Sequence, residues 1–348
     1  MKKAKIGLGV IGFGSMGRTL EVVRDAPGLR YELRAVCGQN PDTLRLRAQQ
    51  AGVPFWTTDY RELVARKDVD VVVVYSPDHL HAQHSLAAIE AGKHVICGKP
   101  NATTLVETIE LVKQVRQKGV KYLAAYTLRQ DQQYFAARKF LDDGDLGELI
   151  VLESHYVHDM RDVYENTPWR LQAPQDMMYG GCMHAIDILR AFAGDVDWVH
   201  ANGNQGHLTP TYPIVDNFFI NMKFKSGAIG RVSGLYGVVH PPMPMNQIGL
   251  YGTRASLISE YGPSQLRVVF DKLAGHPPLV TSFNPEPESR KYWYGPNIVR
   301  YLRHFQDCLD TDQEPSPGIL ESGKSVAVGV AAWESIQTGQ VVKVFNDF

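Results

Sequence analysis

The chain has 348 residues, 44% apolar and 21% charged, proportions typical of a soluble globular protein of about two domains. Its 36 basic and 37 acidic residues give a formal charge of −1, which provides no basic surface for nucleic acid or an anionic membrane. No apolar run approaches the roughly 18 residues of a membrane-spanning helix, and the start has no signal-peptide cleavage site. We expect a cytoplasmic protein with four reduced, widely spaced cysteines: Cys37, Cys97, Cys182 and Cys308.

The first motif is a glycine-rich turn, Gly12-x-Gly14-x-x-Gly17, directly after a short apolar strand. Gly12 permits a tight turn, Gly14 lets the backbone approach a pyrophosphate, and Gly17 allows the next helix to pack closely on the sheet. Leu20 and Val23 continue in a helical pattern, which is the context that this motif requires. The motif therefore predicts dinucleotide binding rather than a merely structural turn.

The first 126 residues alternate between strands and helices. Val69–Tyr75 is a continuous β-branched run, as in a parallel strand buried on both faces. The other expected strands are Tyr31–Cys37, His94–Cys97 and Val120–Tyr126, and the expected helices are Pro41–Gly52, His79–Gly92 and Thr104–Gly119. This alternation predicts an α/β fold with a doubly wound parallel sheet, a Rossmann domain over residues 1–126. Its ligand would lie at the carboxyl ends of the strands, where three segments fall: Gly12–Gly17, Tyr75–His81 and Cys97–Pro100.

Residues 127–348 have a different pattern, which predicts a second, α+β domain for substrate binding and oligomerisation. The expected elements are a turn at Asp142–Gly147, a strand at Glu148–Val157, a loop and helix at Gly180–Phe192, strands and turns over Phe218–Leu257, and helices at Asn297–Leu309 and Gly323–Thr338. The strands indicate a mostly antiparallel sheet that is open on one face. Because an uncovered apolar face needs a partner, we expect a homodimer or homotetramer formed through this sheet.

Lys99 follows an expected strand at the cofactor edge of the sheet, in the loop Cys97–Pro100. A lysine in this position can donate to a substrate hydroxyl and, when partly desolvated, exchange a proton near neutral pH. Most lysines are solvated surface residues, but the placement of Lys99 and the stiffening effect of Pro100 favour a catalytic role.

His184 and Asp187 are three residues apart in the segment that begins at Gly180, so a helix would present both on one face. The carboxylate could then orient the imidazole or join it on a substrate. The spacing alone leaves open an ordinary histidine near a helix start and a surface aspartate.

Two histidine-containing segments lack the pattern of a metal site, and we expect no metal. Residues 78–84 contain three histidines, but no set of cysteine or carboxylate partners at metal-site spacing lies nearby. His155 and His158 fall on opposite faces of an expected strand. Candidate pocket residues, for which ordinary packing is at least as good an explanation, are Tyr156, Trp169, Arg170, Tyr236, His240, Tyr292 and Trp293.

These motifs resemble the Gfo/Idh/MocA oxidoreductase family, the glucose–fructose oxidoreductase and inositol dehydrogenase group, over nearly the whole chain. In the family's order, the matching motifs are the glycine turn, Ser76–His81, Ala91–Val95 running into Lys99-Pro100, Gly144–Gly147, Trp169-Arg170, Gly-x-x-His184-x-x-Asp187 and Glu334–Gly339. The resemblance implies a Rossmann domain, an open-faced α/β domain, and reversible oxidation of a sugar or polyol hydroxyl by NAD or NADP.

The resemblance also implies roles for individual residues. Lys99 is similar to the catalytic lysine of the family's Glu-Lys-Pro motif, His184 to the histidine that shares proton transfer, and Asp187 to the carboxylate after it. The expected cofactor-binding residues are Gly12, Phe13, Gly14, Ser15, Met16, Gly17, Gly38, Gln39, Asn40, Ser76, Pro77, His79, His81, Gly98, Lys99, Pro100, Trp169 and Arg170. The expected substrate-binding residues are Lys99, Tyr126, His155, His184, Asp187 and Tyr236.

Two departures from the family's pattern affect proton transfer. Gly98 stands where the family usually has a glutamate, and Gly180 stands where many members have an aspartate. Lys99 and His184 must then divide the proton transfer between them, or another acid such as Asp176 must substitute.

A third departure affects the cofactor. The second strand ends in Cys37-Gly38-Gln39-Asn40, without the acidic residue with which NAD-preferring members bind the ribose diol. Losing that carboxylate removes the repulsion of a 2′-phosphate, but Arg45 and Arg47 lie further along the next helix. The sequence therefore leaves NAD and NADP both open.

Three functions are compatible with these observations. The first is an NAD(P)-dependent sugar or polyol dehydrogenase or reductase. The second is a redox-neutral enzyme with tightly bound NAD that cleaves or epimerises glycosides, since an altered proton-transfer set can serve altered chemistry. The third is a non-catalytic NAD(P)-binding regulatory protein.

Overall fold

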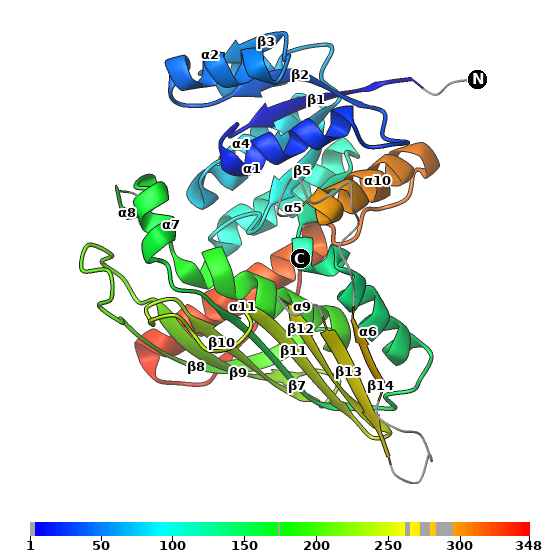
Figure 1. Cartoon of the computed structure of the whole chain (residues 1–348), viewed down its shortest axis with the longest axis vertical. Coiled ribbons are helices and arrows are strands. Elements are labelled where there is room, and N and C mark those ends of the chain that lie inside the picture. The colour runs from blue at the N-terminus through cyan, green and yellow to red at the C-terminus, as the bar shows by residue number, and fades with distance from the viewer. Residues whose placement is uncertain (1–3, 173–174, 262–264, 272–278, 283–294) are drawn as a thin grey trace. The chain divides into compact units, whose positions relative to one another are not determined.

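The computed structural model describes residues 4–172, 175–261, 265–271, 279–282 and 295–348, which fall into two compact units (Figure 1). The first unit takes in the chain up to Gln130, the described residues from helix α10 (Gly295–Thr311) to Gly323, and Phe348. The second takes in the described residues from Asp131 to strand β14 (Leu279–Ser282), and then Lys324–Asp347. The expected division into residues 1–126 and 127–348 differs from this at helix α10, which belongs to the first unit.

Helix α10 belongs there because its apolar face completes a core of the first unit. Its residues in that core are Ile298, Tyr301, Leu302 and Phe305. They pack in one cluster with strand residues such as Leu8 and Val10. The Tyr31 hydroxyl also donates a hydrogen bond of 2.9 Å to the Leu302 carbonyl. A helix distant in sequence therefore covers a face of the N-terminal sheet, and burial of that face fixes its place.

The first unit contains a six-stranded sheet in the order β3-β2-β1-β4-β5-β6, with every pair parallel. The strands are β1 (Ile6–Ile11), β2 (Tyr31–Cys37), β3 (Phe55–Thr57), β4 (Val71–Val74), β5 (His94–Gly98) and β6 (Tyr122–Ala125). This confirms the Rossmann prediction, although the short, partly exposed β3 was not expected. The strand order reverses between β1 and β4, and ligands of such sheets bind at the carboxyl ends beside this reversal.

Helices cover both faces of this sheet. They are α1 (Ser15–Arg18), α2 (Pro41–Gln50), α3 (Tyr60–Val64), α4 (His81–Glu90), α5 (Leu105–Lys118) and α10, with 3₁₀ segments at Thr19–Arg24, Asp78–Leu80 and Thr127–Gln130. The expected helix limits at Thr104 and Gly119 are caps of α5: Thr104 accepts from the Glu107 N–H, and Gly119 has a φ of 63°. The helix expected after Gly17 is instead a four-residue α-helix that continues as a 3₁₀ segment.

The second unit contains a nine-stranded sheet in the order β14-β13-β12-β11-β7-β10-β9-β8-β15. Its strands are β7 (Leu149–Val157), β8 (Val196–Asn204), β9 (Asn217–Phe224), β10 (Ile229–Leu235), β11 (Asn246–Gly252), β12 (Ala255–Tyr261), β13 (Gln265–Phe270), β14 and β15 (Val342–Lys343). Neighbouring strands are antiparallel except β7 and β10, which are parallel. The prediction of a mostly antiparallel sheet is confirmed.

Helices of the second unit pack on one face of this sheet (Figure 1). They are α6 (Gln132–Asp142), α9 (Met183–Ala193) and the part of α11 (Ile319–Thr338) that belongs to this unit, while α7 (Arg161–Asn166) and α8 (Trp169–Gln172) are shorter. Strand residues alternate accordingly, so that Phe218 and Ile220 are buried while Phe219, between them, is exposed. The opposite face mixes apolar and charged groups, including an ion pair of 2.7 Å between Arg231 and Glu153.

Within the described ranges, no helix combines the length and the apolar character needed to cross a bilayer. All four cysteines are buried free thiols.

Candidate functional site

The glycine turn of the first unit fits the phosphate-binding role predicted for it. Gly12 has a φ of 95°, and a Cβ there would lie 2.4 Å from the carbonyl group of Tyr75. A Cβ on Gly17 would lie 2.3 Å from the Gly12 oxygen, so both positions are closed to side chains. A Cβ on Gly14 would have no described atom within 4 Å. The chain is thus packed tightly behind the turn and open at Gly14, the position where the motif predicts the approach of a pyrophosphate.

The segment after β2 is held by its own local hydrogen bonds. Asn40 caps helix α2 by accepting a hydrogen bond of 3.0 Å from the Thr43 N–H. Arg47, from the same helix, donates at 3.3 Å to the carbonyl of Phe13 in the glycine turn. Burial raises the pKa of the Cys37 thiol to about 12, with Asp59 and Glu62 adding to the effect. No acidic side chain lies between Cys37 and Asn40 to take a ribose diol.

Two histidines of α4 hold Ser76, which follows β4. Nε2 of His81 lies 2.7 Å from the Ser76 carbonyl oxygen, and Nδ1 of His84 lies 2.8 Å from the Ser76 hydroxyl. Two of the three histidines of this segment therefore hold the chain after β4. In the part of the chain that the structure describes, no three histidine, cysteine, aspartate or glutamate side chains are grouped to hold a metal ion.

Lys99 follows β5 at the carboxyl edge of the Rossmann sheet. The register pairs Cys97 with Val74 on β4, so the loop after β5 begins beside the segment after β4. The Lys99 side chain is half-buried, whereas Gly98 and Pro100 on either side of it are buried. A Cβ on Gly98 would lie 3.1 Å from Cδ1 of Tyr75 and 3.3 Å from Cε1 of His81. Neighbouring rings thus fill the space into which a side chain at residue 98 would point.

Tyr126, expected to bind substrate, is buried at the end of β6. Its hydroxyl lies 3.4 Å from the hydroxyl of Ser322, which in turn donates to Oδ1 of Asn101. These contacts give Tyr126 a packing role within the first unit.

In the second unit, His184 lies at the start of α9, beside two tyrosines. Its half-buried ring stacks on Tyr156, with ring centroids 5.7 Å apart and an interplanar angle of 15°. Tyr236 is buried 5.9 Å from Tyr156, and its hydroxyl donates to the sulfur of Cys182 at 3.7 Å. The expected loop before α9 is a π-helical turn, Met178–Cys182, that continues into the helix. The structure therefore brings together three predicted residues: His184, Tyr156 and Tyr236.

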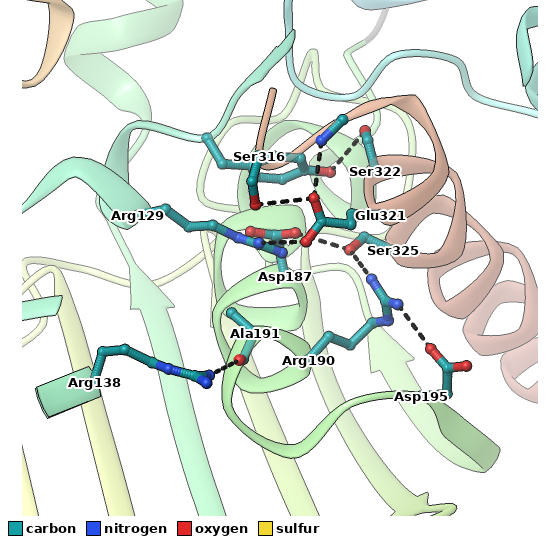
Figure 2. Close-up of polar contacts among 12 residues, drawn as sticks. Arg129, Arg138, Asp187, Arg190, Ala191, Asp195, Ser316, Glu321, Ser322 and Ser325 are labelled. Atoms are coloured by element: carbon teal, nitrogen blue, oxygen red, sulfur yellow. Dashed lines mark hydrogen bonds and ion pairs between the residues drawn. The ribbon is translucent and has the colours of Figure 1, made fainter. Parts of the chain in front are cut away.

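Asp187 lies three residues after His184 on α9. It is 1% exposed, and its Oδ1 accepts a hydrogen bond of 3.0 Å from Ser325 of α11 (Figure 2). Arg190 donates to the same Ser325 hydroxyl at 2.8 Å and to Asp195 at 3.2 Å, and Lys324 also pairs with Asp195 at 2.6 Å. Asp187 is thus buried in polar packing against α11, and the helix face that the i, i+3 spacing has it share with His184 stays a prediction.

Asp176, the alternative acid, is also held by the protein. Its Oδ2 accepts from Nε1 of Trp333 at 2.7 Å, and its Oδ1 accepts from the Met178 N–H at 2.8 Å. The side chain of Gln175 lies where a Cβ on Gly180 would point, with its Cδ 3.1 Å away. Sequence reasoning missed Gln175 and Trp333. Gln175 precedes the π-helical turn in a segment with no recognisable pattern, and Trp333 lies 157 residues after Asp176 in the chain.

His155 is not brought to this cluster. Strand alternation places it on the face of β7 opposite Tyr156, and its Nε2 lies 2.8 Å from the Pro244 carbonyl oxygen. Burial lowers its pKa. Its expected role in substrate binding therefore conflicts with its position.

Trp169 and Arg170 form a pair on helix α8. The Arg170 guanidinium lies 4.5 Å from the centre of the Trp169 ring, and its Nε donates to Thr167 at 3.1 Å. Among the other candidate pocket residues, His240 is exposed, and Tyr292 and Trp293 lie outside the described residues.

Comparison with known proteins finds family matches in both units. Residues 6–126 match a family described as an oxidoreductase family with an NAD-binding Rossmann fold, and residues 134–258 match the Gfo/Idh/MocA C-terminal domain. The chain belongs to the Gfo/Idh/MocA oxidoreductase family. The family resemblance read from the sequence motifs is thereby confirmed.

Several relatives in this family are similar along most of the chain. Levoglucosan dehydrogenase of Pseudarthrobacter phenanthrenivorans is 26% identical over 300 residues, 76% of this chain and 76% of the relative. The scyllo-inositol 2-dehydrogenase (NAD(+)) of Bacillus subtilis is 24% identical over 352 residues, 96% of this chain and 95% of the relative. A solved structure of levoglucosan dehydrogenase in complex with NADH has a TM-score of 0.88 at 24% identity, covering 99% of this chain and 100% of that one. That likeness shows a shared fold.

Proposed function

We propose that this protein transfers hydride between NAD(H) and a hydroxyl or keto group of a sugar, polyol or related carbohydrate. The observation that carries the proposal is the position of Lys99, a half-buried amine directly after β5, at the sheet edge that also holds the Gly12–Gly17 turn. The names of curated relatives, levoglucosan dehydrogenase and scyllo-inositol 2-dehydrogenase (NAD(+)), support carbohydrate as the substrate class.

The residues of the first unit fit a bound dinucleotide. The open position at Gly14 would admit the pyrophosphate, and the segments at Ser76 and Gly98 would border the nicotinamide half. Trp169 and Arg170 stay proposed as cofactor-binding residues. When bound, the nicotinamide ring accepts or supplies hydride.

We assign proton transfer to Lys99 and His184. The amine of Lys99 takes the proton of the substrate hydroxyl during oxidation and returns it during reduction, and its ammonium form stabilises the developing alkoxide. His184, half-buried at the start of α9 and stacked on Tyr156, is suited to exchange a proton with solvent. Asp187 is assigned a positioning role through Ser325, since a carboxylate 1% exposed does not meet a substrate.

We infer that NAD(H) is preferred to NADP(H). Arg47 is held by the Phe13 carbonyl of the glycine turn, and the side-chain oxygen of Asn40 is used as the cap of α2. The Arg47 hydrogen bond occupies a guanidinium N–H that a 2′-phosphate would otherwise accept from, and the Asn40 side-chain oxygen, an acceptor, has no hydrogen bond to offer a phosphate.

The test measures turnover of a panel of carbohydrates with NAD and with NADP. Turnover is monitored through the absorbance of the reduced nicotinamide. Reduction of NAD by a sugar or polyol, faster than reduction of NADP, would support the proposal. Purification with tightly bound NAD and sugar conversion without net NADH would favour redox-neutral glycoside cleavage or epimerisation instead. NADH binding with no conversion across the panel would favour a regulatory protein.

We also propose a homo-oligomer that forms through the open face of the nine-stranded sheet. Ile229 and Phe219, each 50% exposed, lie on this face with the Arg231–Glu153 ion pair. A two-fold partner would bury the apolar groups and let the charged pairs exchange partners. Light scattering should give a multiple of the 38.9 kDa chain mass, and the double substitution Phe219→Glu and Ile229→Glu should give the monomer.

A cytoplasmic location is proposed on the four isolated cysteines, each a buried thiol. Fractionation of the source cells should recover the protein with cytoplasmic markers.

A further inference from the structure

The ring of His81 lies between two backbone carbonyl groups. Its Nδ1 is 2.6 Å from the Pro100 oxygen, and its Nε2 is 2.7 Å from the Ser76 oxygen. The side chain is 3% exposed at the first residue of α4. Pro100 belongs to the loop after β5, and Ser76 to the segment after β4. One ring therefore connects both segments at the carboxyl edge of neighbouring strands.

Two such short contacts specify the protonation state of the ring. A carbonyl oxygen only accepts hydrogen bonds, whereas a neutral imidazole has one N–H donor and one nitrogen that accepts. A neutral ring would therefore leave a lone pair facing a carbonyl oxygen at less than 3 Å. The imidazolium form donates from both nitrogens and satisfies both contacts.

Anionic and polar groups around His81 favour the charged form. Burial opposes the charge, but Cys97 of β5 and Asp78 of the preceding 3₁₀ segment outweigh it and raise the pKa of His81 to about 9. The pKa of the Cys97 thiol is lowered in turn. Burial alone would raise that pKa, but the charge of the nearby His81 ring more than offsets the effect of burial. Each of the two groups thus favours the charged form of the other.

Three further titratable neighbours are neutral near pH 7. Burial and the charge of His81 lower the pKa of His84, on the same helix, to about 4. Burial raises the pKa of the Tyr75 phenol beyond β4 and of the Tyr122 phenol on β6. His84, the neighbouring imidazole of α4, therefore adds no positive charge beside His81 near neutral pH.

We propose that His81 is an imidazolium clamp that joins the segment after β4 to the loop after β5 and thereby positions Lys99. The inference rests on the catalytic role proposed for Lys99. The Nδ1 of His81 meets the carbonyl of Pro100, directly after Lys99, and its Cε1 lies beside Gly98, directly before Lys99, 3.3 Å from where a Cβ there would stand. It acts on the backbone that carries Lys99, so it is a positioning residue.

The clamp fixes the backbone from which the Lys99 side chain extends. Without the second N–H donor, either Ser76 or Pro100 would lose its partner, and a buried carbonyl without a donor is unfavourable. The loop would then shift to find another donor. Misplacement of a reacting group by about 1 Å lowers rates on the order of 10²-fold.

The first test observes the proton directly and needs no turnover. The wild-type protein is labelled with ¹⁵N-histidine, and the His81 resonances are assigned by their absence from His81→Gln. Two protonated ring nitrogens at pH 7.5, lost only in more alkaline solution, are expected. One protonated and one unprotonated nitrogen at that pH would overturn the proposal. This outcome stays readable even if no carbohydrate is turned over.

The second test separates positioning from general stability. His81→Gln should lower kcat on the order of 10²-fold, with a smaller change in KM and with NADH binding retained. The matched control is His94→Gln on the opposite end of β5, where Nδ1 accepts from the Lys121 N–H at 3.0 Å. The control should keep the wild-type kcat. Equal kcat in His81→Gln and wild type, with both folded, would overturn the clamp.

The pH profile gives a readout that a merely structural histidine would not change. As pH rises through the pKa of His81, the clamp loses one donor, so wild-type kcat should fall on the alkaline side. In His81→Gln this alkaline fall should be absent. An identical alkaline fall in both proteins would contradict the proposal. If wild type itself shows no turnover, the proposed function fails, and the ¹⁵N measurement still decides the state of His81.

Discussion

Ser325 donates a hydrogen bond of 3.0 Å to Oδ1 of Asp187, which joins helix α11 to helix α9 within the second unit (Figure 2). The same hydroxyl accepts from Arg190 at 2.8 Å. One small side chain thus links a buried carboxylate to a buried guanidinium, because a hydroxyl has one proton to give and lone pairs to receive. This link fixes the helix on which His184 is carried.

Ser325→Ala should lower the free energy of unfolding by about 1–3 kcal/mol, since it leaves Asp187 and Arg190 each short of a buried hydrogen bond. Urea denaturation measures the change. The control is Ser226→Ala, in the exposed turn between β9 and β10, which should stay within about 0.5 kcal/mol of wild type. An equal loss of unfolding free energy in both variants would show that the Asp187–Ser325–Arg190 link does not stabilise the fold.

Lys99→Ala should lower kcat by about 10²-fold or more, because positioned proton transfer contributes on that scale. NADH binding should remain, since the glycine turn is untouched. Steady-state kinetics and a fluorescence titration with NADH measure the two effects. Lys113→Ala, an exposed lysine on α5, serves as the control and should leave both unchanged. A wild-type rate in Lys99→Ala would remove this residue from the mechanism.

Gly14 and Gly17 should respond differently to alanine, although the motif treats both as glycine positions. Gly14→Ala should fold with an unchanged Tm but bind NAD(H) weakly, because its Cβ would enter the open position where the pyrophosphate approaches. Gly17→Ala should lower Tm, because its Cβ would lie 2.3 Å from the Gly12 oxygen. Thermal unfolding and NADH titration separate the effects, and Gly14→Val should abolish binding. Unchanged affinity in Gly14→Val would refute the motif assignment.

The sequence predicted elements whose signal is local. The buried run at β4 and the caps at Thr104 and Gly119 each identify an element within a few residues, and the structure has them close to the expected limits. The three-residue β3 has too short a pattern to be recognised, and the polarity of residues near it hides it. The placement of α10 depends on a core formed with strands nearly 300 residues away, which no local pattern encodes.

The sequence predicted those residues of the candidate site whose place depends on their position along a strand or a helix. Lys99 became a candidate because it follows a strand, and His184 because of its motif, and their catalytic roles stay predictions. The spacing of His184 and Asp187 did not reveal that Ser325 would bury the carboxylate, since α11 lies far along the chain. Likewise, the role of His81 depends on two backbone carbonyls whose distances only the folded chain provides.

His84 should make the protein less stable as the pH falls below neutrality. In the folded chain, burial and the charge of His81 lower its pKa from 6.5 to about 4, so the unfolded chain binds the proton first. The His84 contribution is therefore fully present above pH 6.5 and is lost as the pH falls towards 4, by roughly 3 kcal/mol in total.

Urea denaturation across that pH range should show a smaller loss of stability in His84→Gln than in wild type, because glutamine does not titrate. His207→Asn is the matched control at an exposed position, where asparagine tolerates the φ of 55°. This control should keep the wild-type dependence on pH. Parallel curves for wild type and His84→Gln would show that Ser76 is not held by a neutral imidazole, because a ring already charged in the folded state would gain no proton over this range.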